Sequence, residues 1–316
     1  MRIHIIPFLA IVILTPISLN AQPTNGLGMW VWSNSAFSTH KARQQLVQFC
    51  VQKRISHLDV HTKMFWKGVK PIVQNSRALK KLILLAGKNN ITTAILRGYP
   101  QMFFSKNHEQ TLSELHAIID FSKTLPNNNL FKGIKYDVEP YGTEEWKAKG
   151  STLEAVMRDY LTFLRKAGSV LHEKAPLLWL AVDTPFWWDN DEFILEFRGK
   201  RKRFSEHVQD FTDFIVIMSY RRSAHKILAC GESERMYAQS VNKVIYLSLE
   251  TIKLKQNPQI SFWGASTEEF WKVLNQLQEI AQKDPALDGV MIHNYRGLVE
   301  KLNDDTPNKP ASGDGR

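Results

Sequence analysis

The stretch Gly133-Ile-Lys-Tyr-Asp-Val-Glu139 lies near the middle of the chain and has the character of a β-strand that ends in acidic side chains. Side chains of a strand alternate between its two faces, so Asp137 and Glu139 are expected on the same face. Pro140 and Tyr141 follow directly. The stretch therefore predicts a strand whose carboxyl end carries two neighbouring carboxylates.

Seven further short runs of this kind occur along the chain. With residues 133–139 as the fourth, the predicted strands are Gly28–Trp32, Ile55–His61, Ile91–Arg97, Leu177–Asp183, Phe214–Tyr220, Val244–Glu250 and Gly289–Tyr295. Most are near-continuous apolar runs, which is typical of parallel strands covered by helices on both faces. The predicted helices, with apolar residues at helical spacing, are Lys41–Lys53, Ser76–Asn89, Glu109–Lys123, Leu153–His172, Glu206–Asp210 and Glu268–Lys283.

A strand–helix alternation repeated eight times at this length predicts an α/β fold, a single-domain (β/α)8 TIM barrel over residues 22–302. An open doubly wound sheet is the alternative. That fold normally has a glycine-rich first turn, and Trp30-Val-Trp-Ser-Asn34 is not glycine-rich.

Residues 1–21 are predicted to be a secretory signal peptide. They hold an apolar run, Ile5–Leu19, with Arg2 before it and the small residue Ala21 after it. Two prolines interrupt the run, which makes an uncleaved anchor the less favoured alternative. No later segment is apolar enough to span a bilayer. We therefore expect a secreted or periplasmic protein with no stable membrane insertion after signal cleavage.

The composition is that of a globular protein. Of 316 residues, 43% are hydrophobic and 23% are charged, which excludes wholesale disorder, collagen and coiled coil. Residues 303–316 are rich in Asp, Pro, Gly and Ser and are expected to be disordered. The net charge is +10, and loss of residues 1–21 removes only Arg2, leaving +9. A basic surface favours anionic partners such as acidic polysaccharide, although solubility alone can account for it.

Several classes of site are disfavoured by missing motifs. The sequence has no CxxC pair, no His/Cys cluster and no glycine-rich phosphate loop, so we expect no metal and no cofactor. Cys50 and Cys230 are expected to be free. The basic run Arg198–Arg203 is predicted in the loop between strands five and six, and few aromatics interleave it, so no nucleic-acid partner is expected.

Polar side chains gather at the predicted strand ends, where TIM barrels build their sites. They are Asp59, His61, Arg97, Asp137, Glu139, Asp183, Tyr220, Glu250, His293 and Tyr295. Repulsion between the paired carboxylates, together with burial, favours a proton on one of them, and such a group can act as a general acid. Glu139, nearer the strand end, is our choice for that acid. The alternative is that Asp137 merely pairs with Arg97 in the barrel wall.

Glu250 ends the seventh predicted strand, across the barrel from the fourth. Glu139 and Glu250 could thus face a sugar ring from opposite sides, and their separation would decide between a covalent intermediate and attack by water. Alternatively, Glu250 accepts a hydrogen bond from a substrate hydroxyl or forms a salt bridge. His293 likewise has two interpretations, a functional side chain or a core histidine bonded to backbone.

Aromatic side chains crowd the same predicted rim. They are Trp30, Trp32, Phe65, Trp66, Tyr99, Tyr141, Phe186, Trp187, Trp188 and Trp263. Aromatic rings stack on the apolar faces of sugars, so aromatics beside acids predict a carbohydrate site. Trp188 is the preferred candidate, because we expect that neighbouring tryptophans on a loop cannot all be buried.

The chain resembles a group of secreted bacterial proteins in the glycoside hydrolase barrel superfamily. The motifs that carry the resemblance are Gly28-Met-Trp-Val-Trp, Gly133-Ile-Lys-Tyr-Asp-Val-Glu-Pro-Tyr, Asp183-Thr-Pro-Phe-Trp, Met218-Ser-Tyr-Arg, Leu249-Glu-Thr, Ile260-Ser-Phe and Gly289-Val-Met-Ile-His-Asn-Tyr. The resemblance covers essentially the whole chain after the signal and implies the barrel fold.

A more distant similarity is to chitinase-like glycoside hydrolases, with strand motifs DGxDxDxE and MxYD. The matching residues are Gly133, Asp137, Glu139, Met218 and Tyr220, whereas Lys132, Lys135 and Arg221 replace three aspartates of the pattern. In that family the glutamate protonates the leaving oxygen, while the aspartate and tyrosine steer an attacking N-acetyl group. Retaining barrels of another clan place an acid in an Asn-Glu-Pro sequence on strand four and a nucleophilic glutamate on strand seven. Glu139-Pro140 and Glu250 resemble that arrangement, with Val138 at the asparagine position.

Together these patterns predict a secreted glycosidase that cleaves a polysaccharide or glycan, with an anionic one among the candidates. Glu139 is the predicted general acid/base, assisted by Asp137, and Glu250 the nucleophile or second carboxylate. The predicted substrate-binding residues are Tyr220, Asp183, His293, Tyr295, Trp188, Trp32, Arg97 and Tyr141. A catalytically inactive carbohydrate-binding barrel is the alternative, because several positions beside the acids are substituted. A hydrolase or lyase of another bond is a third possibility.

Overall fold

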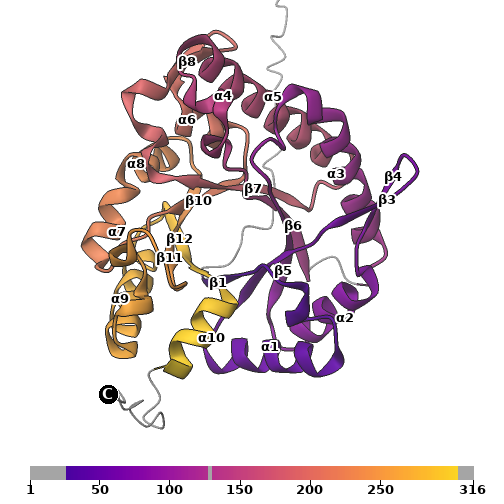
Figure 1. Cartoon of the computed structure of the whole chain (residues 1–316), viewed down its shortest axis with the longest axis vertical. Helices are drawn as coiled ribbons and strands as arrows, with labels where there is room; N and C mark the ends of the chain where they lie inside the picture. Colours follow the sequence, from indigo (N-terminus) through magenta and orange to yellow (C-terminus); the bar gives the residue numbers. More distant parts are fainter. Residues whose placement is uncertain (1–25, 127–129, 305–316) are drawn as a thin grey trace, which may run out of the picture.

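A closed barrel of eight parallel strands forms the centre of the molecule (Figure 1). The computed structural model describes residues 26–126 and 130–304. Around the ring the strands follow chain order: β1 Gly26–Val31, β2 His57–His61, β5 Thr92–Arg97, β6 Phe131–Tyr136, β7 Trp179–Pro185, β10 Phe214–Met218, β11 Val244–Glu250 and β12 Leu287–His293. Every neighbouring pair is parallel, and β12 closes the ring against β1. The predicted single-domain (β/α)8 TIM barrel is confirmed.

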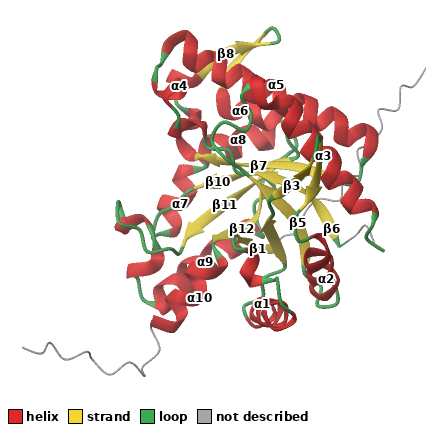
Figure 2. Ribbon diagram, turned by 45° about the vertical axis from the view of Figure 1, so that its right-hand side comes forward, coloured by secondary structure: helices red, strands yellow, loops and turns green. Residues whose placement is uncertain are grey.

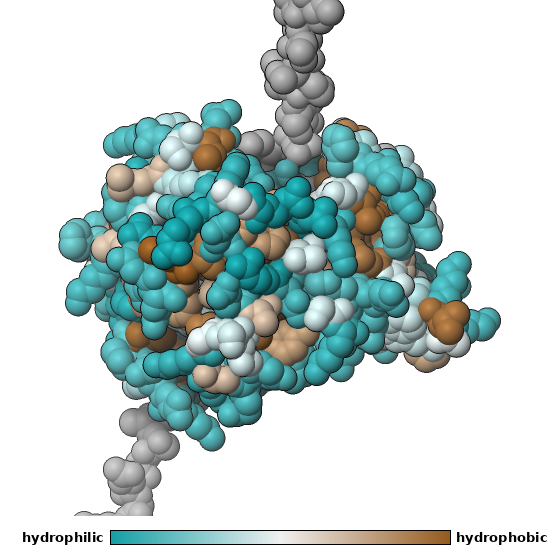
Figure 3. Space-filling view, turned by 90° about the horizontal axis from the view of Figure 1, so that it is seen from above, coloured by the Kyte–Doolittle hydropathy of each residue, from teal (hydrophilic) through white to brown (hydrophobic). Residues whose placement is uncertain are grey.

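Helices surround the barrel (Figure 2). The six predicted ones are found within three residues of their expected limits, as α1 His40–Gln52, α2 Ser76–Gly87, α3 His108–Lys123, α5 Gly150–Lys174, α6 Phe204–Asp210 and α9 Thr267–Ala281. Four more were not predicted: α4 Glu144–Lys147, α7 Ala224–Cys230, α8 Glu232–Ser240 and α10 Tyr295–Asp304. The face of the molecule seen from above in Figure 3 is largely hydrophilic.

Two hairpins extend beyond the barrel. One consists of β3 Met64–Lys67 and β4 Lys70–Val73, the other of β8 Ile194–Phe197 and β9 Lys200–Arg203. The second corrects the prediction that Arg198–Arg203 is a loop. Arg198 and Gly199 have positive φ and form the turn, and the basic residues after them form an antiparallel strand.

Four predicted strands end earlier than expected. β1 ends at Val31, one residue before Trp32. β6 ends at Tyr136 and β10 at Met218, so Asp137, Glu139 and Tyr220 lie on loops just beyond their strands. Tyr295 does not extend the last strand but begins α10. Between β5 and β6 the hydrogen-bond ladder continues for one more bond, from the Asp137 N–H to the Arg97 carbonyl at 2.8 Å. Pro140 then opens a 3-10 turn and ends the strand direction.

Two apolar layers hold the barrel together. Alternate strand positions fill the interior with Trp30, Leu96, Trp179, Phe214 and Tyr246, and the opposite positions pack under the helices. Three charged side chains, Lys135, Asp59 and Asp183, lie buried together in this interior. The interior is therefore a packed core that places the strand ends rigidly.

The structure describes only part of the segments predicted to be the signal peptide and the tail. The signal at 1–21 and residues 305–316 lie outside the described residues, while residues 303 and 304 end α10 instead of beginning a tail. Cys50 and Cys230 are both free. Within residues 26–126 and 130–304, every helix is too short or too polar to cross a membrane.

Candidate active site

The carboxyl ends of four strands bring four carboxylates near one phenol, the Tyr220 side chain. Burial and the negative charges of Glu250, Asp137, Asp183 and Glu139 together raise the pKa of Tyr220 well above its usual value. These acids come from β6, β7 and β11 or the loops directly after them. Residues more than 110 positions apart in the sequence thus act on the same hydroxyl group at the barrel mouth.

Asp137 is the most perturbed carboxyl of this group. Its Oδ1 atom is buried and has no hydrogen-bond partner among the described residues. Burial raises its pKa well above the ordinary value, and the charges of Asp183 and Glu139 add to the effect against the opposing ammonium of Lys135. Asp137 therefore holds a proton at a pH at which an exposed aspartate would have lost it.

Glu139 is half-buried and lies at the start of the 3-10 turn Pro140–Gly142. It forms a hydrogen bond with the Tyr141 hydroxyl, whose pKa is raised by burial and by the Glu139 charge. Glu139 forms no ion pair within the described part of the chain. The mouth therefore holds a carboxylate free of any bound cation beside a carboxyl that favours its protonated form.

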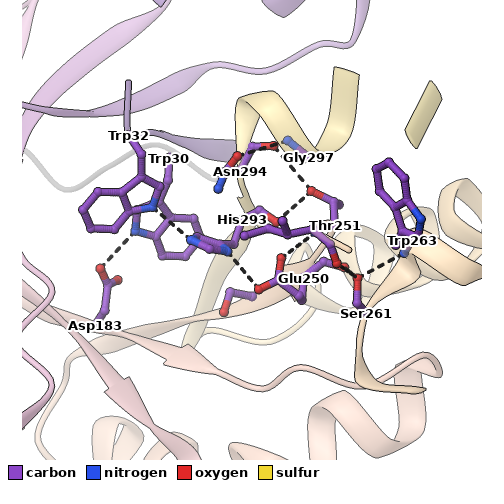
Figure 4. A network of polar contacts seen from close by, with 12 residues as sticks. Trp30, Trp32, Asp183, Glu250, Thr251, Ser261, Trp263, His293, Asn294 and Gly297 are labelled. Atoms are coloured by element: carbon purple, nitrogen blue, oxygen red, sulfur yellow. Dashed lines mark hydrogen bonds and ion pairs between the residues drawn. The ribbon is translucent and has the colours of Figure 1, made fainter. Parts of the chain in front are cut away.

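Glu250, His293 and Trp32 form a second network at the mouth (Figure 4). The Trp32 indole N–H donates to His293 Nε2 at 2.9 Å, so Nε2 must be the unprotonated nitrogen. His293 Nδ1 consequently carries the proton and donates it to Glu250 Oε2, also at 2.9 Å. Tyr220 stacks on the His293 ring at 6.1 Å between centroids.

Both oxygens of Glu250 are occupied. Oε1 accepts the Ile252 backbone N–H at 2.8 Å while Oε2 accepts from His293, and the residue is only 3% exposed. This is the arrangement of the alternative interpretation, in which Glu250 is a bonding partner within the protein. His293 is not a core histidine bonded to backbone, because both ring nitrogens bond to side chains.

A buried ion cluster lies beneath the mouth. Lys135 Nζ is 2.6 Å from Asp59 Oδ2 and 3.0 Å from Asp183 Oδ1, and it lies 3.8 Å from the centre of the Trp30 ring. Trp30 Nε1 donates to the other Asp183 oxygen at 3.0 Å. Burial raises the pKa of Asp183 to about 6 even with this ammonium beside it.

Three predicted substrate-binding residues are corrected by these contacts. Asp183 is buried with both oxygens engaged, so it supplies negative charge to the mouth and no free acceptor. Arg97 shares the outward face of β5 with Ile95 and pairs with Glu114 of α3 at 2.5 Å. That contact also removes the alternative in which Arg97 neutralises Asp137.

Trp188 is the third correction. It is 0% exposed and stacks on Trp146 at 5.8 Å, with Phe204 and Tyr160 also against its ring. The expectation failed because helices α4 and α6 cover the loop after β7. Its half-buried neighbour Trp187 packs edge-on against Tyr141, at 5.3 Å.

A groove of about 800 Å³ opens beside the two networks, over the ends of β1, β2 and β12. Trp32, His61 and Tyr295 line it, whereas Asp137, Glu139 and Glu250 do not. The Trp32 ring lies 5.1 Å from the His61 ring between centroids, tilted by 41°, and its indole N–H bonds to His293, so this residue connects the groove to the carboxylates.

Two residues that position the site, Lys135 and Gly98, are not among the candidates that the sequence patterns predict. Lys135 was noted only as a departure from the chitinase-like pattern, although its inward position, two residues before Asp137, follows from strand alternation. Gly98 was overlooked: a Cβ built there would lie 1.7 Å from the Asp137 carbonyl oxygen. Its position directly after the third predicted strand was the only available signal.

Metal binding receives no support from the part of the chain that the structure describes. No three or more His, Cys, Asp or Glu side chains there are grouped so that they could hold a metal ion. The side chains at the mouth can transfer protons, through the Asp137 and Glu139 pair, and can form hydrogen bonds, through Tyr220, Tyr141 and His293.

No protein-family model matches the sequence, and no curated protein matches it significantly. Its structural neighbours are glycoside hydrolase TIM-barrel enzymes. A GH113 β-1,4-mannanase superposes with a TM-score of 0.55 at 10% identity, covering 86% of this chain and 88% of that one. The β-glycosidase from Pyrococcus horikoshii superposes with a TM-score of 0.56 at 11% identity, covering 85% of this chain and 84% of that one. The endo-1,4-β-mannanase from Rhizomucor miehei superposes with a TM-score of 0.58 at 8% identity, covering 87% of each chain. At these identities the likeness shows the fold alone.

Proposed function

We propose that the protein is a glycoside hydrolase whose acid/base chemistry resides in Asp137 and Glu139. The observation that carries the proposal is the pairing of a carboxyl of raised pKa with a cation-free carboxylate at the mouth of the barrel. Such a pair can hold one proton and transfer it to a glycosidic oxygen. The barrel architecture shared with mannanases and a β-glycosidase supports the reaction class.

In this proposal Glu139 meets the leaving oxygen, because it lies beyond the strand end and is nearer the opening than Asp137. Asp137 keeps the shared proton available when Glu139 is ionised. Tyr220 and Tyr141 present hydroxyl groups to the same space. Glu250 holds His293 in one tautomer, so its role as nucleophile would require the 2.9 Å contact with His293 to break.

The substrate is a polysaccharide or glycan, and the net charge of +10 favours an anionic one. The predicted signal peptide at 1–21 supports a secreted or periplasmic location. An aromatic wall of Trp32 and Tyr295 suits the apolar faces of sugar rings.

Release of reducing ends from a panel of neutral and acidic polysaccharides tests the proposal. The wild-type protein should release them from at least one polymer, and Glu139→Gln should abolish the release while its circular dichroism spectrum and melting temperature stay unchanged. Full turnover by a folded Glu139→Gln protein would remove Glu139 from the mechanism.

A catalytically inactive sugar-binding barrel is the second candidate. The bonded state of Glu250 favours it, because no second carboxylate is free to attack or to activate water from that side. It predicts saturable binding of a glycan without any released reducing ends, and binding that Glu139→Gln leaves unaltered.

A further inference from the structure

The groove beside the carboxylates is lined by loops that follow four neighbouring strands of the barrel, β2, β1, β12 and β11. Residues Ser33–Ala36 follow β1, Lys63 follows β2, and Ile252 and Lys253 follow β11. In the ring, β2 and β11 are separated by β1 and β12. Lys63 and Lys253 therefore approach the groove from different sides.

The groove is positively charged. Its charged lining residues are Lys63, Lys253, Arg296 and Glu300, and Arg296 Nε pairs with Glu300 Oε1 at 2.6 Å. Lys63 and Lys253 are exposed and form no ion pair within the described residues. His61 adds no charge near neutral pH, because burial and the nearby cations Arg97 and Lys63 lower its pKa to about 4. Two lysine charges are thus left without an anion.

The wall between these lysines contains a partly exposed Trp32 ring. A sugar ring that stacks on Trp32 would lie next to the residue that bonds to His293 at 2.9 Å, which in turn bonds to Glu250. The hydroxyl groups of Ser33 and Ser35 lie on the same wall and bond to each other at 2.7 Å. The groove thus combines a stacking surface, hydroxyl partners and unneutralised cations, and it adjoins the candidate catalytic mouth.

We propose that this groove is a subsite for an acidic sugar residue, with the sugar ring on Trp32 and its carboxylate or sulfate group attracted by Lys63 and Lys253. The inference rests on the proposed carbohydrate function and names the class of glycan. Carboxylate and sulfate share the chemistry that lysine recognises, namely a compact anion that accepts hydrogen bonds from an ammonium group.

The test is titration calorimetry at low salt with Glu139→Gln protein, which prevents turnover. The probes are hexasaccharides of galacturonate and mannuronate, a chondroitin sulfate hexasaccharide, and neutral mannohexaose and cellohexaose. At least one acidic probe should bind more tightly than the neutral ones, and its affinity should fall with added salt. Preference for carboxylated or sulfated probes identifies the source of the anion.

The double variant Lys63→Gln, Lys253→Gln should bind the acidic probe about tenfold more weakly, because two partly screened charge contacts are lost. Lys67→Gln with Lys70→Gln is the matched control. It removes the same charge from the exposed β3–β4 hairpin, outside the groove lining, and should change affinity less than twofold. Trp32→Phe, which keeps an aromatic ring, should retain more binding than Trp32→Ala.

Three outcomes would overturn the subsite: no probe binding, equal binding of acidic and neutral probes, or equal losses in the two double-lysine variants. These outcomes differ from failure of the proposed function. A wild-type protein that binds acidic probes through Lys63 and Lys253 but releases no reducing ends keeps the subsite and loses the hydrolase. Hydrolysis of a neutral polymer at a rate unchanged by substitution of both lysines would keep the hydrolase and remove the subsite.

Discussion

Asp137 has two carboxylates, Asp183 and Glu139, as the neighbours that raise its pKa, while the Lys135 ammonium is already bonded to Asp59 and Asp183. A proton on Asp137 relieves the repulsion, so the folded protein binds that proton more tightly than the unfolded chain does. The same side chain thereby lowers stability when ionised and supplies a proton to the site. Function and stability make opposite demands on this residue.

Asp137→Asn is therefore expected to abolish hydrolysis and raise stability at alkaline pH. Because the pKa of Asp137 is raised in the folded protein, ionisation of this side chain destabilises the fold. The destabilisation begins as the pH rises above about 4, where the unfolded chain loses this proton, and it grows until the pH passes the folded-state pKa. The gain in melting temperature over wild type should be larger at pH 8 than at pH 5. A gain that is larger at pH 5 would contradict the raised pKa.

Gly98 sets the position of the Asp137 backbone by close approach. Gly98→Ala would force its Cβ against the Asp137 carbonyl oxygen, so we expect a loss of about 2–4 kcal/mol of stability and at least a tenfold fall in kcat/KM. Chemical denaturation and initial rates measure the two effects. Gly142→Ala, with nothing within 4 Å of its added Cβ, is the control and should change both little.

At the scale of elements, β6 joins the mouth to the core through the buried Lys135 ammonium. The eight strands and six helices could be predicted because their apolar runs and helical spacing are local properties of the sequence. The two hairpins and α4, α7, α8 and α10 could not, since such short segments form these elements only when packed against neighbours. Strand ends were overestimated because residues such as Tyr220 have high β propensity even on a loop.

Lys135→Met is expected to destabilise the barrel by about 3–5 kcal/mol at pH 7, because Asp59 and Asp183 are left buried without their cation. Loss of the ammonium raises the pKa of both carboxyls in the folded state. The folded variant then takes up more protons than the unfolded chain on acidification. The loss of stability relative to wild type should therefore be smaller at pH 5 than at pH 7. Urea denaturation at both pH values measures it.

Lys132→Met, on the same strand and outside this cluster, provides the control for Lys135→Met. It should alter stability by less than about 0.5 kcal/mol. Equal losses in both variants would show that the buried ion cluster is not what stabilises the strand.

Glu234 in α8 is buried away from the site, and burial with the Asp189 charge raises its pKa to about 8. The folded protein binds this proton more tightly, so ionisation reduces stability as pH rises from about 4 to above 8. Glu234→Gln should gain about 1–3 kcal/mol at pH 8 and less at pH 5. Thermal melts compare it with exposed Glu232→Gln, for which no such pH-dependent gain is expected.

At the scale of the whole molecule, a protein with a net charge of +10 concentrates acids at one end of its barrel. The convergence of Asp137, Glu139, Tyr220, Glu250 and His293 was predictable, because a closed parallel barrel brings all carboxyl strand ends to one face. The bonding state of each side chain was not. Which acids are bonded depends on partners far apart in sequence, as Glu250 and His293 show.

The outward position of Arg97 follows from strand alternation, because the inward positions of β5 are Ala94 and Leu96. The burial of Trp188 needed tertiary structure. Nothing local shows that Trp146, which follows the fourth predicted strand, stacks on it.

The measurement that tests the central claim most directly is the leaving-group dependence of Glu139→Gln. On the polysaccharide that the wild-type protein cleaves, the variant should be slower by about 10²–10⁴-fold, since the leaving oxygen needs a proton. On the dinitrophenyl glycoside of the same sugar, whose leaving group needs none, it should be slower by less than about tenfold. Equal losses on both substrates, or no loss on the polysaccharide, would contradict Glu139 as the general acid.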